Sequence, residues 1–278
     1  MTITRPSTSS SAARTIDDFG EQWTWHTDNS GYYASDELLR DILEPLVPIE
    51  RVKGARIAEI GCGTGRICAM LLEAGAAEMT GVEPSAAADV AARNLARYGE
   101  RFRLVRAEGT SVPKDGFDLV VSIGVIHHIP EPKPVLAAMY ESLRPDGTAL
   151  IWVYGREGNG AYLALARMLR AVTTRLPHKA LVAFTGVVWV FAIVYGRLAA
   201  LVPGAPLREY FRRYFLRLSP SKQHLVIYDQ LNPAHALYYR RHEVEALLKD
   251  AGFADVALHH RHGYSWTASG RRPARGSR

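Results

Sequence analysis

The stretch AEIGCGTGR, residues 58–66, decides the fold of this 278-residue chain. A short apolar run leads into it and apolar residues with helical spacing follow it, so a strand is expected to pass into a helix here. Gly61, Gly63 and Gly65 allow the backbone to turn sharply and to approach a ligand, which the first amides of the helix then face. The spacing is G-x-G-x-G rather than the dinucleotide-binding pattern G-x-G-x-x-G, and Glu59 precedes the first glycine. The stretch therefore predicts a ligand-binding turn between a strand and a helix.

Strand and helix patterns alternate around this turn. Because strands separated by helices pair in parallel, the alternation predicts a doubly wound, Rossmann-like α/β sheet with helices on both faces. The alternation stops after Gly155 and returns near residue 240. The expected strands cover residues 56–61, 78–83, 102–107, 117–124, 148–155, 254–261 and 264–269, and the expected helices cover residues 66–76, 85–99, 132–147 and 240–253.

Composition and pattern divide the chain into six segments. The first lacks the apolar core of a secretory signal, and we expect it to be disordered. The fourth is helical, basic and apolar, and it is inserted after the fifth strand. The segments are a disordered lead (1–15), an N-terminal helical lid (16–50), the α/β core (51–155), a basic hydrophobic helical cap (156–222), a C-terminal part that completes the sheet (223–266) and a basic tail (267–278).

The net charge of +6 is unevenly distributed along the chain. Residues 156–222 hold eleven Lys and Arg residues against two acidic residues, a net charge of +9, and residues 271–278 add +4. Local positive charge of this kind favours anionic partners such as membrane headgroups, phosphates or nucleic acid. The two cysteines, Cys62 and Cys68, are too few for a disulfide framework and match no common zinc spacing, so we expect a reducing compartment and no metal site.

Further motifs follow the glycine turn in a fixed order. They are GVEPS (81–85), RAEGTSVP (106–113), FDLVVSIGVIHHIPEP (117–132) and LRPDGTALIW (143–152). With AEIGCGTGR, this series resembles the class I S-adenosylmethionine-dependent methyltransferases, especially the bacterial enzymes that act on small molecules. The resemblance covers residues 56–154. It implies S-adenosylmethionine as the methyl donor and S-adenosylhomocysteine as the product.

The resemblance also implies roles for individual residues. The glycine turn would lie along the methionine part of the cofactor, and Glu59 would help to hold its positively charged amino-acid end. Glu83 would accept hydrogen bonds from both ribose hydroxyls, and Glu108 would accept one from the adenine amino group, at a position where the family more often has Asp. Ile123, Gly124 and Val125, at the end of the fourth strand, would lie beside the sulfonium. The implied cofactor residues are Glu59, Gly61, Cys62, Gly63, Thr64, Gly65, Glu83, Pro84, Glu108, Gly109, Ile123, Gly124 and Val125.

The acceptor should arrive near the end of the fourth strand. Methyl transfer from a sulfonium is an in-line displacement, so a general base is needed only when the acceptor must lose a proton. His127 and His128 follow the fourth strand; we prefer His128 as the base, and loop packing or a place in the shell around the cofactor is the alternative for both. Members of this family usually cover the active site with segments before the first strand and after the fifth. The candidate acceptor-binding residues in these segments are Trp23, Trp25, His26, Tyr32, Tyr33, His235, Tyr238 and Tyr239, although core packing would also explain part of this set.

Residues 180–203, ALVAFTGVVWVFAIVYGRLAALVP, are apolar enough to be a membrane segment. One crossing would place the strands before and after it on opposite sides of a bilayer, which a single sheet excludes. The basic amphipathic stretches 161–179 and 208–218 favour a cap that lies on an anionic membrane surface through residues 160–218. A hydrophobic pocket wall, a homodimer contact and a paired span stay open as alternatives. Nucleic acid is disfavoured as a partner because the apolar content is high.

These observations predict a methyltransferase that uses S-adenosylmethionine and acts on a small or amphiphilic acceptor, such as a lipid-linked compound, at a membrane surface. We expect a cytoplasmic protein that binds peripherally to the inner face of the membrane. Two other functions stay open. One is a soluble enzyme that methylates a secondary metabolite or a sugar, and the other is a non-catalytic module that binds S-adenosylmethionine.

Overall fold

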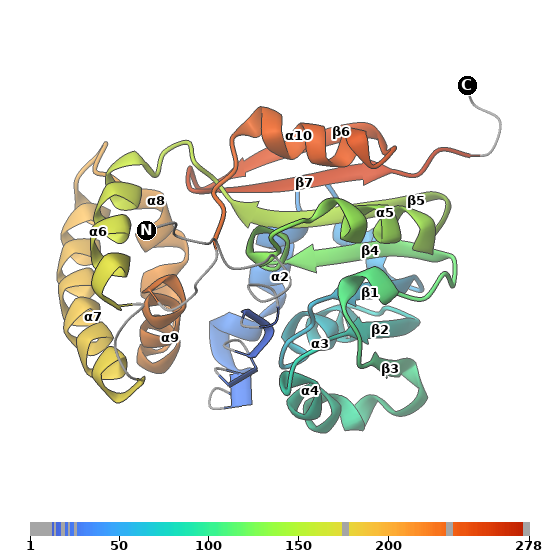
Figure 1. Cartoon of the computed structure of the whole chain (residues 1–278), viewed down its shortest axis with the longest axis horizontal. Coiled ribbons are helices and arrows are strands. Elements are labelled where there is room, and N and C mark those ends of the chain that lie inside the picture. The colour runs from blue at the N-terminus through green and yellow to red at the C-terminus, as the bar shows by residue number, and fades with distance from the viewer. Residues whose placement is uncertain are drawn as a thin grey trace, which may run out of the picture.

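A computed structural model gives the fold of the chain. It describes residues 27–173, 178–231 and 236–274, together with residues 13, 15–17, 20, 21, 23 and 24. Among these residues the strands form a seven-stranded sheet in the order β3-β2-β1-β4-β5-β7-β6 (Figure 1). The strands are β1 (Arg56–Ile60), β2 (Glu78–Val82), β3 (Phe102–Val105), β4 (Phe117–Ile123), β5 (Leu143–Tyr154), β6 (Ala254–Arg261) and β7 (Ser265–Arg271).

The first five strands are parallel, as the alternation of strands and helices predicts. In the register, Ala58 of β1 lies between Thr80 of β2 and Val120 of β4. The last two strands form a hairpin, and β7 enters the sheet antiparallel to β5 with Thr267 opposite Trp152. The α/β fold expected from the sequence is therefore confirmed, and the antiparallel edge is an addition to it.

Helices cover both faces of the sheet because successive strand residues point to opposite sides. On one face, Ile57 and Val121 pack with α2, α3 and α4. On the other face, Ala58 and Val120 pack with α5 and α10. These helices are α2 (Asp36–Leu43), α3 (Arg66–Glu73), α4 (Ala87–Leu95), α5 (Lys133–Ser142) and α10 (Arg241–Asp250), and short 3₁₀ helices are η1 (Gly31–Ala34), η2 (Ile49–Val52), η3 (Ala96–Arg101), η4 (Gly109–Ser111) and η5 (Ile126–His128).

The insertion after β5 folds into a separate layer of helices, which we call the cap. Its elements are α6 (Gly160–Thr173), α7 (His178–Leu201), α8 (Arg208–Arg213), η6 (Phe215–Arg217) and α9 (Pro220–Leu231). Phe211, Phe215, Ile227 and Leu231 form the centre of a small hydrophobic cluster within the cap. The cap lies beyond the carboxyl ends of the parallel strands, which is where ligands bind in open α/β sheets (Figure 1).

Three boundaries differ from the expected segments. Thr15, assigned to the disordered lead 1–15, is helical and buried. The cap continues through α9 to Leu231 rather than ending at residue 222, because α9 packs against α6 and α7. β7 pairs with β5 as far as Arg271, so the first residues of the expected tail 267–278 belong to the sheet.

Helix α7 is the apolar stretch that the sequence singles out. Residues Ala180–Leu201 of this helix have a mean hydropathy of 1.9. By its length and composition alone, the helix could cross a membrane. Only 17% of its most apolar window is buried. However, β5 before the cap and β7 after it are hydrogen-bonded neighbours, so one crossing between them is excluded. The helix therefore presents a long apolar face on the outside of the cap.

Candidate active site

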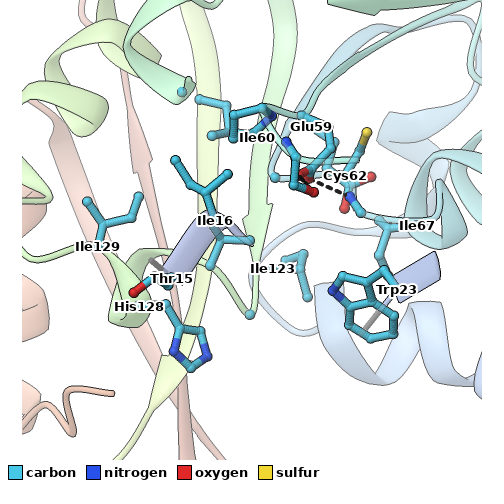
Figure 2. Close-up of a pocket in the computed structure, with 18 of the residues that line it drawn as sticks. Thr15, Ile16, Trp23, Glu59, Ile60, Cys62, Ile67, Ile123, His128 and Ile129 are labelled. Carbon is cyan, nitrogen blue, oxygen red and sulfur yellow. Dashed lines mark hydrogen bonds between the residues drawn. The ribbon is translucent and has the colours of Figure 1, made fainter. Parts of the chain in front are cut away.

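A cavity of about 230 Å³ opens at the carboxyl ends of β1, β2 and β4, next to the glycine turn. We call it the cofactor cavity. In Figure 2, His128 and Ile129 lie on one side of it, Glu59 and Cys62 lie on the other, and Ile16 lies between them. The predicted cofactor residues line this cavity with the exception of Gly65; the lining members are Glu59, Gly61, Cys62, Gly63, Thr64, Glu83, Pro84, Glu108, Gly109, Ile123, Gly124 and Val125.

The glycine turn has the backbone that its sequence predicts. Gly61 has a φ of +74°, and a Cβ at this position would lie 2.4 Å from Cγ2 of Val125. Gly65 has a φ of +80°, and its Cβ would lie 2.5 Å from Cδ1 of Leu95 in α4. Gly65 therefore allows α3 to approach α4 and does not line the cofactor cavity. Its expected contact with the cofactor is corrected to a packing role.

Glu83 follows β2 and is held by three hydrogen bonds. The Gly63 amide donates to its Oε2 at 2.9 Å, while the Ser85 amide and hydroxyl donate to its Oε1 at 3.0 and 2.6 Å. The side chain is buried. Because a carboxylate oxygen can accept two hydrogen bonds, Oε2 retains an acceptor site for a hydroxyl group. This arrangement fits the ribose of S-adenosylmethionine and links the glycine turn to the end of β2.

Glu59, near the end of β1, is buried in the wall of the cofactor cavity. Burial raises the pKa of its carboxyl group to about 7, and the Cys68 thiol, which donates to its Oε2 at 3.0 Å, opposes this shift. Burial also raises the pKa of the Cys68 thiol well above its ordinary value, so the thiol stays protonated and remains a donor. An ammonium group in the cavity would find a carboxylate that ionises near neutral pH. The residues present therefore fit the charged end of the cofactor as well as its ribose.

The two histidines occupy different positions. His128 lines the cofactor cavity. His127 does not: its ring is fully buried, 3.9 Å from the ring centre of Tyr154 and 5.9 Å from that of Trp152. Because His127 packs inside the fold, it is corrected from a candidate base to a core residue. The ring centres of His128 and His127 are 4.2 Å apart, so the two side chains pack together and only His128 reaches the cofactor cavity.

A second cavity, of about 150 Å³, lies between the sheet and the cap. We call it the aromatic cavity because seven tyrosine and tryptophan side chains line it. Its aromatic lining residues are Trp23, Tyr33, Trp152, Tyr154, Tyr210, Tyr214 and Tyr264, and its polar ones are Arg66, Asp229, Gln230 and Arg261. Six residues line both cavities, namely Trp23, Tyr33, Arg66, Ile123, Gly124 and Asp229. The two cavities are therefore neighbours with a common wall.

A polar network holds the cap against β5 beside the aromatic cavity. The Gln230 side-chain amide donates to the Tyr154 hydroxyl at 2.6 Å, and the hydroxyls of Tyr162 and Tyr238 donate to its Oε1 at 2.5 and 3.2 Å. Arg170 donates to the Gln230 carbonyl at 2.8 Å. Burial raises the pKa of Tyr154 well above its ordinary value, so its hydroxyl stays protonated.

The predicted acceptor residues separate into three groups. Trp23 and Tyr33 line both cavities, and Arg66 stacks over the Tyr33 ring at 4.1 Å. Tyr32, Tyr238 and Tyr239 line neither, which corrects their assignment. The Tyr32 hydroxyl donates to the Arg213 carbonyl at 2.9 Å, Tyr238 stacks on Tyr154, and the Tyr239 amide pairs with the Tyr154 carbonyl. Trp25, His26 and His235 lie outside the described residues.

Several lining residues were missed by sequence reasoning. Arg66 directly follows the glycine turn, so its position in the motif could have revealed it. Thr15 and Ile16 lie at the border between the expected lead and lid, where the local pattern is weak. Asp229 belongs to α9, and its segment carries no motif. Its place at the site depends on how the cap folds back, which no local pattern encodes.

Comparison with known proteins places the chain in a family. The model of a methyltransferase domain family matches residues 32–258, which is most of the chain. Among curated proteins, the chain is 27% identical over 136 residues to a ubiquinone biosynthesis O-methyltransferase of Bradyrhizobium sp. (strain ORS 278), covering 48% of this chain and 53% of the relative. A protein of the same name from Azorhizobium caulinodans is 29% identical over 136 residues. The chain thus spans about half the length of the curated relatives it matches.

Solved structures agree on the fold. The chain is similar to a 1,6-didemethyltoxoflavin-N1-methyltransferase of Burkholderia thailandensis with bound S-adenosylhomocysteine, with a TM-score of 0.54, 17% identity and coverage of 99% of this chain and 93% of that one. It is also similar to magnesium protoporphyrin IX methyltransferase of Synechocystis PCC 6803, with a TM-score of 0.53, 15% identity and coverage of 96% and 100%. The match over residues 32–258 identifies the chain as a member of this methyltransferase domain family, and its strand order and cofactor cavity agree with the fold of class I S-adenosylmethionine-dependent methyltransferases.

Proposed function

We propose that the protein transfers the methyl group of S-adenosylmethionine to a small amphiphilic acceptor with an aromatic head group. The observation that carries this proposal is the common wall of the cofactor cavity and the aromatic cavity. A planar ring can pack against Tyr and Trp side chains in the aromatic cavity while its substituent reaches Ile123 and Gly124. An aromatic acceptor also agrees with the name of the curated relatives, which describes O-methylation in the biosynthesis of a quinone.

The chain's own residues would divide the work of methyl transfer. S-adenosylmethionine supplies an electrophilic methyl group on a sulfonium sulfur. Glu83 would orient the ribose through its Oε2, and Glu59 would hold the amino-acid end when it is ionised. The aromatic walls would exclude water and align the acceptor, which is the main requirement of an in-line displacement.

We further propose that the cap brings the acceptor from a membrane surface. Exposed apolar side chains recur along α7 at helical spacing, and Phe191, Leu198 and Leu201 are 71%, 61% and 79% exposed. Arg197 is exposed on the same helix, and three arginines of α8 share the single carboxylate of Glu209. An apolar face beside surplus positive charge is complementary to an anionic leaflet. We therefore propose that the protein lies on the cytoplasmic face of a membrane and does not cross it.

The test of the acceptor class is transfer of labelled methyl groups into cell extracts. The protein and methyl-labelled S-adenosylmethionine are incubated with the lipid fraction and with the aqueous fraction of the extract. Label is expected in a lipid-extractable product that absorbs as an aromatic compound. Label confined to water-soluble products would support a soluble metabolite or sugar as the acceptor instead. No label in either fraction would favour a cofactor-binding module without turnover.

A further inference from the structure

Asp229 is the acidic side chain at the junction of the two cavities. It comes from α9 in the cap, whereas the other carboxyl groups that line the cofactor cavity, Glu59, Glu83 and Glu108, come from the α/β core. Among the described residues that line both cavities, it is the one carboxylate. The same common wall contains Ile123 and Gly124 at the end of β4, where the resemblance places the sulfonium. The carboxylate therefore lies between the expected donor and acceptor positions.

The position of Asp229 is fixed by the polar network of the cap. The Tyr154 hydroxyl donates to its Oδ2 at 3.4 Å, and the same hydroxyl accepts from the Gln230 amide at 2.6 Å. Arg170 holds the neighbouring backbone through the Gln230 carbonyl at 2.8 Å. Tyr154 and Gln230 are thus positioning residues, which keep this turn of α9 directed at the site.

The predicted base, His128, is less well placed for the acceptor. It lines the cofactor cavity but not the aromatic cavity, and its ring packs against those of His127 and Tyr154. A base must lie within hydrogen-bond reach of the proton that it removes. An acceptor bound in the aromatic cavity meets Asp229 on the common wall and does not meet His128.

We propose that Asp229 is the catalytic base and that it accepts the proton of a phenolic hydroxyl bound in the aromatic cavity. This inference rests on the proposed function, because it assumes a methyl donor in the cofactor cavity. The hydroxyl oxygen bonds to the methyl carbon while its proton passes to the Asp229 carboxylate. The bond between the methyl carbon and sulfur breaks, and its electron pair stays on sulfur, which becomes a neutral thioether.

The test compares two ligands of the cofactor cavity by calorimetry. Sinefungin resembles S-adenosylmethionine but carries an ammonium group in place of the transferable methyl, whereas S-adenosylhomocysteine carries nothing there. A carboxylate that faces the methyl position should attract this ammonium group. We expect Asp229→Asn to weaken sinefungin binding by about tenfold or more and to leave S-adenosylhomocysteine binding nearly unchanged. Retained S-adenosylhomocysteine binding also shows that the variant is folded.

Two variants serve as controls. Glu131→Gln removes an exposed acid in the loop after the lining residues Ile129 and Pro130, and it should change neither affinity. Asp229→Glu keeps the carboxylate and should restore part of the preference for sinefungin. An equal affinity ratio for the two ligands in the wild type and in Asp229→Asn would overturn the assignment of Asp229 alone. Failure of the wild type to bind either ligand would overturn the proposed function together with it.

The acceptor class has its own measurement. Phenol and toluene serve as probes for the complex with S-adenosylhomocysteine, and their binding is followed by ligand-observed NMR. We expect the wild type to prefer phenol over toluene and Asp229→Asn to lose most of this preference. The reason is that a carboxylate accepts a stronger hydrogen bond from the phenol hydroxyl than the amide of Asn does. A preference for phenol that is equal in both proteins would overturn the contact between Asp229 and the acceptor.

Discussion

The Glu59 carboxyl group is buried near the end of β1, directly before the glycine turn. Its pKa lies at about 7 instead of 4.5 because burial disfavours the charged form. The group therefore changes charge near neutral pH, next to the site where the resemblance places the amino group of the cofactor. The protonation state of a single residue is expected to control how tightly the charged end of the ligand is held.

Binding of S-adenosylhomocysteine should therefore depend on pH through Glu59. Only the ionised carboxylate attracts an ammonium group. Binding should therefore be weaker below about pH 7, where Glu59 is protonated, and stronger above it, where Glu59 is ionised. We expect the dissociation constant, measured by calorimetry, to fall as the pH rises through this range. Glu59→Gln should bind more weakly at high pH and should lack this dependence. A pH profile that is unchanged in Glu59→Gln would assign the titration to another group.

For single residues, the sequence predicts a place at the site when the residue belongs to a local motif. Glu83 and the glycine turn occupy fixed positions in motifs, so their place at the cavity follows from the order of residues. Tyr32 is a candidate because it is an aromatic residue in the expected lid, and His127 because it is titratable and follows the fourth strand. The structure directs the first to Arg213 and buries the second, since side-chain direction depends on packing partners far away in the chain.

Helix α7 has one packed face and one exposed face. One face packs on α8 and α9, and the opposite face is apolar and exposed. Gly196 lies on the packed face, where an added Cβ would be 2.3 Å from Cδ1 of the buried Phe211. Gly186 lies elsewhere on the same helix, and its Cβ would meet no atom closer than 3.9 Å.

These two glycines allow a matched test of the cap. Gly196→Ala should destabilise the protein by about 1–3 kcal/mol, because overpacking outweighs the gain in helix propensity. Gly186→Ala should stabilise it by up to about 1 kcal/mol, because only the propensity changes. Both values are to be measured by urea unfolding at one pH. Equal effects of the two substitutions would contradict the close packing of α7 on α8.

The exposed face of α7 leads to a prediction about membranes. Phe191→Asp places a charge in the centre of this face, and it should weaken flotation with phosphatidylglycerol liposomes by about tenfold or more. Because Phe191 is exposed, the substitution should leave the unfolding midpoint nearly unchanged. Phe191→Leu keeps the face apolar and should float like the wild type.

Other outcomes of the flotation experiment point to other occupants of this face. Wild-type protein that ignores both phosphatidylglycerol and phosphatidylcholine liposomes would contradict the membrane proposal. If such protein sediments as a dimer and Phe191→Asp makes it a monomer, the face is a contact between two copies of the chain. The sequence showed that the helix is apolar, but its composition could not tell which face is covered.

For the whole molecule, the order of strands and helices determines where the site lies. Parallel strands direct their carboxyl ends to one edge of the sheet, so motifs distant in sequence meet there (Figure 1). The alternation of patterns predicted this edge and the five parallel strands. It did not predict that β7 inserts next to β5, because antiparallel pairing of the last strands depends on contacts made over more than one hundred residues.

Only part of the structure of the cap could be predicted from the sequence. Its helical content and its boundary after β5 could be predicted from composition, whereas its docking could not. Asp229, Gln230 and Tyr154 meet only when α9 folds back onto the sheet. Polar contacts of this kind leave no periodic signal in the sequence, so the acceptor side of the site became visible only in the structure.

Binding of S-adenosylhomocysteine to the wild type and to Glu83→Ala, measured by calorimetry, tests the central claim most directly. Glu83→Ala removes the buried carboxylate that we expect to face the ribose, and Glu78→Ala removes an exposed carboxylate at the start of β2, the strand that Glu83 follows, as a control. We predict that Glu83→Ala weakens binding by about tenfold to a hundredfold, as expected for hydrogen bonds to a charged group, while Glu78→Ala binds like the wild type. Absence of binding to the wild type, or equal binding to the wild type and Glu83→Ala, would contradict the account.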